Sequence, residues 1–484
     1  MTDPSTSDRS TRVVLKFGGT SVASVHGWHT IAELATRRLE SGERFVIAHS
    51  ALAGVTDMLE RLPEAAVAGE HEAVLEAIAE KHFSLCRELG IDGPSILEVE
   101  LAELRRSTRG IALLEEVTPR IRARILAFGE RLSTRLGAAY LTSVGLPVEW
   151  MDSGELLPAV ETDRQSGASV WLSAECDPDF DPALRERLDA LPGFGLTQGF
   201  IARRPDGEPV VLGRGGSDTA AAYLAGKWGA DRLEVWSDVP GMFTADPRVV
   251  PSARLLRHLN YQEAQEITTT GSQVLHPRAI RALRDREIPI HLKSTLDPLA
   301  PNTVIRPSGS TGPARVKAIS WKRQVVLVSM ETLGMWQEVG FLARAFGVFR
   351  DLGISIDLVS TSETNVTVSL DPKAALLDER TLGELTTALS RFCRVQVLRP
   401  CAAVSLVGSR IRDLLHAIGP ALEAFEDQRI HLVSQAASDL NFTVVVEENG
   451  GAELIRQLHG LLIPEGDDPQ ETFGPSWEEL QASR

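Results

Sequence analysis

Residues 12–50 consist of a short apolar stretch, an amphipathic stretch and a second short apolar stretch. Residues 13–15 predict a buried strand, and residues 44–50 predict another. The helix expected between them ends before Gly42, and its apolar face is made of Trp28, Ile31, Ala35 and Leu39. Strand, helix and strand at this spacing predict a βαβ unit with a parallel sheet. The alternation continues over roughly the first 300 residues, which are therefore expected to form an α/β domain.

The composition indicates a multidomain globular protein and argues against nucleic-acid binding and membrane association. A chain of 484 residues that is 43% hydrophobic suits about three domains with a sizeable core. Its formal net charge of −16 disfavours a nucleic-acid partner. The apolar runs are too short for a membrane-spanning helix, and polar residues 1–12 lack the apolar part of a secretory signal. We therefore expect no membrane association, and a disordered N-terminus.

The four cysteines point to a reducing compartment. None of them forms a C-x-x-C pair, so neither a disulfide framework nor a zinc site is indicated; they are Cys86, Cys176, Cys393 and Cys401. A cytoplasmic protein that holds no metal ion of its own is the simplest expectation.

Two glycine-containing loops suit a phosphate. The first follows the opening strand, where Lys16 precedes Gly18 and Gly19. The second carries Arg214 within residues 213–218 and precedes a helix of small residues, whose N-terminus offers free N–H groups to an anion. The alternatives are a tight turn with Lys16 in solvent, and a structural loop whose Ser217 or Asp218 only caps the helix.

A further strand is expected to end near Ser237. Asp238, Asp246 and Arg248 cluster just beyond it, and their residue types alone favour ordinary turn chemistry.

An internal repeat of about 70 residues follows residue 310. Residues 353–370 and 428–446 share a Leu-Val-Ser core, and each follows an amphipathic helix and ends in an alternating strand. The pattern predicts two β-α-β-β units that pack on each other or on a second subunit. The alternative is two structural modules that only dimerise. Residues 464–484 are acidic and predict a linker or a frayed end.

Taken in order, the motifs resemble those of aspartokinases, which belong to the amino-acid kinase superfamily and carry paired ACT domains. The resemblance runs from Val13 to Ile463, and its motifs are "KFGGTSV", "TQGFIA", "LGRGGSD", "WSDVPGMFTADPR" and "VLHP". It implies an α/β amino-acid kinase fold, with a mostly parallel central sheet and helices on both faces, followed by two ferredoxin-like ACT domains of the α+β class. The implied division is a disordered 1–12, a catalytic 13–308, a first ACT domain 325–396, a second ACT domain 316–324 plus 397–463, and a tail 464–484.

The resemblance implies that ATP phosphorylates the side-chain carboxylate of L-aspartate to give 4-phospho-L-aspartate, the entry step to lysine, threonine and methionine. It gives Lys16 contact with the ATP phosphates and the developing charge, and Asp218 the orientation of Lys16. Magnesium is implied, held mostly by phosphate oxygens. The other nucleotide-binding positions carried over are Gly18, Gly19, Ser50, Ser237, Asp238 and Arg248, with Thr20 and Ser21 as further hydroxyl donors.

For the substrate, the resemblance assigns Arg214 to the α-carboxylate and Glu130 to the α-ammonium, with Thr56 and Ser217 completing the pocket. Helical periodicity alone contradicts the second assignment, because it places Glu130 on the solvated side of its helix, away from Phe128.

The sequence departs from the family pattern around the nucleotide. Ser237 keeps the usual hydroxyl, whereas Phe243 loses one that the family often has. Gln273 stands where a lysine is expected, so the site has one cation fewer.

The first repeat resembles the ACT unit of lysine-sensitive aspartokinases. Asp357 matches the aspartate that meets the ε-ammonium of lysine, and His431 occupies the equivalent place in the second repeat. The first repeat is therefore expected to bind L-lysine as an inhibitor, within a homodimer formed by the ACT domains. The other pocket positions are Met335, Glu338, Gly340, Phe341, Leu342, Ser355, Ser362 and Glu363.

Two other hypotheses about the function are also compatible with the sequence. One is an amino-acid kinase for another substrate, and the other is a catalytically impaired lysine sensor, which only Gln273 favours. The sequence leaves open whether threonine acts with lysine, and whether the chain is half of a fused bifunctional enzyme.

Overall fold

A computed structural model describes residues 10–161, 167–271, 274–307, 314–331, 339–371, 377–414, 419–426, 428–435, 438–464, 466 and 472–482. Gln273, Met335 and Glu338 lie outside these residues, so their assigned roles stay predictions. None of the helices in the described part of the chain is both long and apolar enough to cross a membrane.

An eight-stranded sheet forms the centre of the N-terminal half, in the order β11-β13-β12-β9-β1-β2-β6-β3. All neighbouring pairs are parallel except β12 and β13, so the expectation of a mostly parallel α/β sheet is confirmed. The strands are β1 (Arg12–Phe17), β2 (Arg44–His49), β3 (Val148–Met151), β6 (Phe194–Gln198), β9 (Arg232–Ser237), β11 (His258–Asn260), β12 (Ile290–Ser294) and β13 (Thr303–Arg306).

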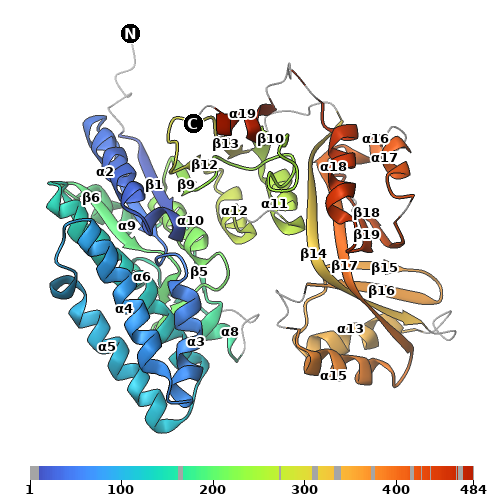
Figure 1. Ribbon diagram of the computed structural model, residues 1–484, viewed down its shortest axis with the longest axis horizontal. Coiled ribbons are helices and arrows are strands. Elements are labelled where there is room, and N and C mark those ends of the chain that lie inside the picture. Colours follow the sequence, from blue (N-terminus) through green and yellow to red (C-terminus); the bar gives the residue numbers. More distant parts are fainter. Residues whose placement is uncertain are drawn as a thin grey trace.

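Long helices cover one face of this sheet (Figure 1). The first of these helices, residues 25–40, has the ends that its sequence favours. The side chain of Ser24 caps its N-terminus, and Gly42, with φ of 72°, follows its C-terminus. Trp28 and Ile31 of that helix are fully buried against the sheet. The helices are α2 (Val25–Glu40), α3 (Val55–Val67), α4 (His71–Glu88), α5 (Gly93–Leu114) and α6 (Pro119–Ser143).

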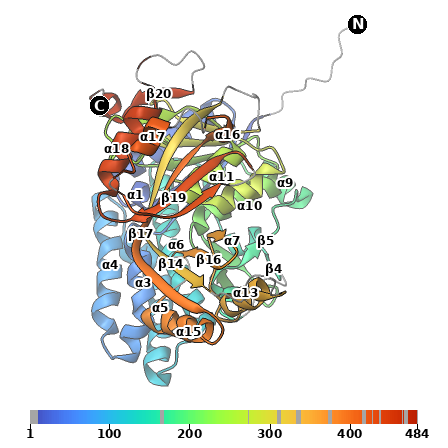
Figure 2. The same ribbon diagram turned by 90° about the vertical axis from the view of Figure 1, so that its right-hand side faces the viewer.

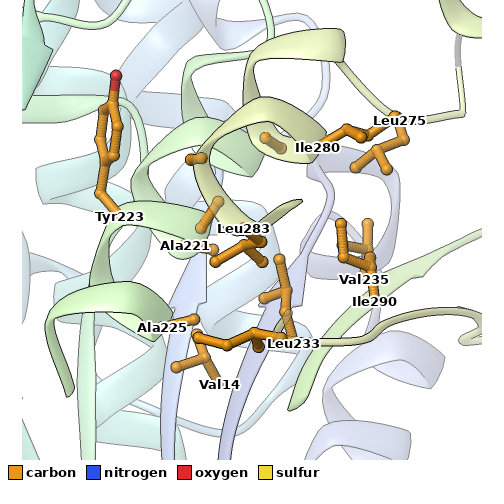
Figure 3. Packing of buried hydrophobic residues seen from close by; sticks show 14 of the residues in the cluster. Val14, Ala221, Tyr223, Ala225, Leu233, Val235, Leu275, Ile280, Leu283 and Ile290 are labelled. Atoms are coloured by element: carbon orange, nitrogen blue, oxygen red, sulfur yellow. The ribbon is translucent and has the colours of Figure 1, made fainter. Parts of the chain in front are cut away.

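The opposite face packs against α10 (Gly216–Trp228) and α12 (Pro277–Arg284). Figure 3 shows Val14, Leu233 and Val235 of the sheet in one cluster with Ala221 and Ala225 of α10 and Leu283 of α12. The small side chains of α10 let the helix approach the sheet closely, which fixes its N-terminus at the carboxyl ends of the strands. Helices α9 (Pro182–Asp189) and α11 (Tyr261–Thr270) flank this layer.

Short elements complete the N-terminal half. Strands β7 and β8 pair as an antiparallel hairpin around a turn at residues 205–207. These elements are α1 (Gly19–Val22), α7 (Ser153–Leu156), β4 (Ala159–Val160), α8 (Ser169–Leu172), β5 (Glu175–Cys176), β7 (Ile201–Arg203), β8 (Pro209–Val211) and β10 (Arg254–Leu256).

A second, six-stranded antiparallel sheet forms the C-terminal half, in the order β15-β16-β14-β17-β19-β18. Two long strands, β14 (Arg315–Glu331) and β17 (Arg394–Ser409), pair along the middle and run through both repeat units (Figures 1 and 2). The outer strands are β15 (Leu358–Thr361), β16 (Asn365–Leu370), β18 (Ile430–Gln435) and β19 (Asn441–Glu447).

Each unit has its own helices and core. Phe341 and Phe349 of α13 lie in the first core, and Leu454 and Leu458 of α18 lie in the second. The repeat expected from the sequence is therefore present as two units that share their central strands. The helices are α13 (Phe341–Asp351), α15 (Glu379–Leu389), α16 (Ile411–Leu414), α17 (Gly419–Glu423) and α18 (Gly451–Leu462).

The prediction of a linker or a frayed end is wrong for residues 473–482. These residues form β20 (Phe473–Ser476), which pairs antiparallel with β10, and α19 (Trp477–Ala482). In Figure 1 they lie over β10, back against the N-terminal half. Local composition could not predict this strand, because its partner β10 lies about 220 residues earlier in the chain.

Candidate active site

Lys16 and Asp218 form an ion pair at the carboxyl end of the parallel sheet. Lys16 lies near the end of β1, and Asp218 lies in the first turn of α10. Lys16 Nζ is 2.7 Å from Asp218 Oδ1, and each side chain is only 11–12% exposed. The sequence expectation that Asp218 accompanies Lys16 is thus matched by the geometry, and the reading with Lys16 in open solvent is wrong.

The loop after β1 packs between the loops that follow β2 and β9. Gly18 donates its backbone N–H to the carbonyl of Trp236 at 3.1 Å. A Cβ at Gly19 would lie 2.8 Å from the carbonyl oxygen of Ala51, so no larger residue fits there without moving the backbone. Ser50 donates its N–H to Phe17 O at 3.1 Å. Three strand ends therefore meet at one place, where parallel α/β sheets bind ligands.

Glu130 is buried beside this loop. It is 3% exposed, and its Oε1 accepts the N–H of Ala51 at 3.1 Å. Its Oε2 is buried, and no residue in the described part of the chain donates to it. Burial raises the pKa of Glu130 to about 8, although the N–H of Ala51 and the charge of Lys16 act in the opposite direction.

The periodicity-based placement of Glu130 in solvent is therefore wrong. Helix α6 is covered on more than one side, because the loop after β2 lies across it. A Cβ at Gly129 would lie 2.9 Å from Ala51 Cβ, which shows how closely the loop and the helix approach. The sequence does carry one sign of this close packing, because Gly129, directly before Glu130, is a glycine within a long helix.

The remaining substrate candidates border the same region. Arg214 is exposed, with no ion pair to any residue the structure describes, and it precedes Gly215, the left-handed N-cap of α10. Ser217 is half-buried against Gly199, where an added Cβ would lie 2.7 Å from Ser217 Cβ. Thr56 is half-buried in the first turn of α3.

Helix α12 holds the loop that carries Arg214. The backbone N–H of His276 donates to Asp218 Oδ2 at 3.3 Å. The guanidinium of Arg278 donates to the carbonyls of Leu212 at 2.6 Å and Ala174 at 3.0 Å. The sequence reasoning missed these contacts, although Arg278 directly follows the "VLHP" motif.

The nucleotide candidates lie on and after β9. The hydroxyl of Ser237 donates to Val239 O at 3.0 Å, and Asp238 is exposed. Arg248 is 86% exposed and pairs with Asp246 through two hydrogen bonds of 3.0 and 2.8 Å, as turn chemistry would give.

Phe243 has a different environment from these polar candidates. Its ring is 7% exposed and lies edge-on to Trp477 of α19, with 5.5 Å between centroids. The ring therefore packs in a hydrophobic cluster, and the expected place of Phe243 at the nucleotide stays a prediction.

In the first repeat, Asp357 is already paired. Lys322 Nζ is 2.6 Å from Asp357 Oδ2 and 3.1 Å from a carboxylate oxygen of Asp371. Gly340 caps α13 with φ of 98°, and Phe341 is buried. The other described candidates are exposed: Leu342, Ser355, Ser362 and Glu363. In the second repeat, His431 Nε2 lies 3.9 Å from Glu447 instead.

Comparison with known proteins agrees with this geometry. The model of the amino acid kinase family matches residues 11–294. Aspartokinase 1, chloroplastic, of Arabidopsis thaliana is 33% identical over 94% of this chain and 80% of its own length. Lysine-sensitive aspartokinase 3 of Escherichia coli (strain K12) is 32% identical over 93% of this chain and 99% of its own length.

Solved structures extend the similarity to both halves. The R-state of E. coli aspartokinase III, in complex with aspartate and ADP, has a TM-score of 0.80 and 31% identity over 93% of this chain and all of its own. Its T-state, in complex with lysine and aspartate, has a TM-score of 0.73 and 30% identity, over 93% of this chain and 99% of its own. The chain therefore belongs to the amino acid kinase family and, within it, to the aspartokinases.

Proposed function

We propose that this enzyme transfers the γ-phosphoryl group of ATP to the side-chain carboxylate of L-aspartate, giving 4-phospho-L-aspartate. The observation that carries the proposal is the Lys16–Asp218 pair beside a buried Glu130 with one unpartnered oxygen. The similarity to aspartokinase III in complex with aspartate and ADP supports the same substrates.

Lys16 acts on the phosphates. Its ammonium is held at 2.7 Å by Asp218, so it is fixed in place before the nucleotide arrives. Phosphoryl transfer needs positioning and charge stabilisation more than covalent chemistry, and the aspartate carboxylate is already a nucleophile. Gly18 and Gly19 keep side chains out of the phosphate path. Ser50, Ser237, Asp238 and Arg248 complete the proposed nucleotide site, together with Gln273, which lies outside the described residues.

Two opposite charges recognise the amino-acid end of aspartate. Arg214 is exposed and not ion-paired within the described chain, so its planar guanidinium is available to the α-carboxylate. Glu130 receives the α-ammonium on the oxygen that has no partner within the described residues. Thr56 and Ser217 lie half-buried in the same region and contribute hydroxyls.

Magnesium fits this site as a partner of the nucleotide. No three His, Cys, Asp or Glu side chains gather as a metal site among the residues described. Phosphate oxygens would therefore be its main ligands, and its charge would offset that of the triphosphate.

The C-terminal half regulates the enzyme through L-lysine. The relative named lysine-sensitive and the solved complex with lysine support this role. Asp357, with Gly340, Phe341 and the exposed pocket residues, forms the proposed site. We assign the catalytic domain to 13–308, the first ACT domain to 325–396, and the second to 316–324 plus 397–463, and we propose a homodimer through the ACT units. The four free cysteines suit a cytoplasmic location.

ADP release from Mg-ATP, measured with aspartate, glutamate or acetylglutamate and with or without millimolar lysine, tests the proposal. We expect release with aspartate alone among the three, suppressed by lysine. Release with another acceptor instead would overturn the substrate assignment, and a rate indifferent to lysine would overturn the regulation.

A further inference from the structure

The segment 238–257, between β9 and β11, is held by the C-terminal residues 472–482. The strand β20 pairs with β10 so that Arg254 lies opposite Ser476 and Leu256 opposite Phe473. Beyond the paired strands, Trp477 donates its N–H to Ala253 O at 2.8 Å. The two segments are therefore joined through the backbone, side by side in Figure 1.

Side chains strengthen this attachment. The guanidinium of Arg254 donates to Gly474 O at 3.0 Å, and its carbon lies 5.5 Å from the ring centroid of Phe473. Trp477 packs edge-on against Phe243, and Leu480 is buried in the same cluster. An edge-to-face aromatic pair is attractive beyond its buried area, so Trp477 is a side-chain anchor of this segment on Phe243.

The second repeat holds the segment from another side. Thr244 Oγ1 and His459 Nε2 of α18 are 2.8 Å apart, and both residues are buried. Ile319 of β14 donates its N–H to Thr244 O at 2.7 Å. Residues 243–255 are therefore held so that they move together with α18, β14 and α19.

This segment begins with Asp238 and contains Arg248, which belong to the proposed nucleotide site. We infer that residues 472–482 position the nucleotide-binding end of the catalytic domain, with Trp477 as a positioning residue that acts through Phe243. The inference rests on the proposed nucleotide role of this segment. It gives a function to a stretch whose composition indicated a linker or a frayed end.

The test compares Trp477→Ala with Trp477→Phe in the full chain. We expect the alanine variant to raise the KM for ATP and the Kd for ADP by about fivefold or more, since an aromatic pair is lost. The KM for aspartate should stay within about twofold, and the phenylalanine variant should recover most of the ATP affinity. Glu478→Ala is the matched control, because Glu478 lies on the same short helix with an exposed side chain.

Asp238→Ala separates the inference from the function on which it rests. If Asp238→Ala weakens ADP binding in calorimetry while Trp477→Ala leaves it unchanged, the positioning role is wrong. If Asp238→Ala also leaves ADP binding unchanged, the proposed nucleotide role of the segment fails. An equal loss for ATP and aspartate in folded Trp477→Ala would mean general structural damage and would also overturn the positioning role.

Discussion

Glu130 and Asp357 are both proposed to receive an ammonium group, and the structure gives them opposite environments. Glu130 is 3% exposed and has one oxygen without a partner among the described residues. The Asp357 side chain is 31% exposed and already pairs with Lys322 at 2.6 Å. The carboxylate proposed for the substrate is thus buried with one oxygen unpartnered among the described residues, whereas the carboxylate proposed for regulation is partly exposed and paired with a lysine of the same chain.

This difference implies that the affinity for aspartate and the affinity for lysine are set in different ways. A buried carboxylate without a full set of partners is costly, and a ligand ammonium relieves that cost on binding. An accessible carboxylate gains less from an ion pair, and a ligand must also displace the tethered Lys322. We therefore expect the aspartate pocket to be organised before binding. Lysine, by contrast, should bind well only when the regulatory units rearrange.

Removing the catalytic cation should give the largest effect. Lys16→Met removes the ammonium that Asp218 holds and that we propose contacts the phosphates, so we expect kcat to fall by about 10³-fold or more. Steady-state kinetics measure this change, and lysine binding should persist because Asp357 lies in the other half. A variant with near-normal kcat would show that Lys16 has only a structural role.

Replacing the buried carboxylate of Glu130 should give the next largest effect. Glu130→Gln keeps the shape and the contact with the Ala51 N–H but removes the charge that meets the α-ammonium. We expect the KM for aspartate to rise by about 30- to 100-fold while the KM for ATP changes little, as loss of a buried charge pair predicts. Equal increases in both values would contradict this division of roles.

The corresponding change in the regulatory half should be smaller. Asp357→Asn removes the accessible carboxylate, and we expect about tenfold more lysine to be needed for half inhibition, with kcat preserved. Asp351→Asn is the matched control, because Asp351 lies in the same repeat unit and pairs with exposed Arg350. Unchanged lysine inhibition in Asp357→Asn would place the site elsewhere.

Removing the competing ammonium should act in the opposite direction. Lys322→Met frees Asp357 from its intrachain partner, so lysine should inhibit at about three- to fivefold lower concentration. Inhibition curves for the variant and the parent protein measure the shift. A loss of inhibition would instead mean that Lys322 organises the pocket for its ligand.

These two carboxylates also show what the sequence can and cannot reveal. The βαβ pattern of residues 12–50 predicts the parallel sheet, and the glycine loops at Gly18 and Gly215 predict the edge where ligands bind. Periodicity misplaces Glu130, because it describes one buried face and α6 has more than one. The Lys322–Asp357 pair and the pairing of β20 with β10 depend on tertiary contacts between distant residues, which local patterns do not contain.

The raised pKa of Glu130 makes it possible to measure whether this carboxyl receives the α-ammonium of aspartate. With a pKa of about 8, Glu130 is mostly protonated at pH 7 in the free protein. Between about pH 4.5 and 8 the folded state holds a proton that the unfolded state has lost, so this group makes the free protein less stable as pH rises through that window. Aspartate should reverse the balance, because its ammonium favours the ionised carboxylate.

Calorimetric titration of aspartate at pH 7, in two buffers of different ionisation enthalpy, measures the protons exchanged on binding. We expect release of up to about one proton, and aspartate affinity that rises between pH 6 and 8. The Glu130→Gln variant, titrated at aspartate concentrations that saturate it, should release none. Equal proton release from both proteins would show that Glu130 does not receive the ammonium group, and would contradict the account of the active site.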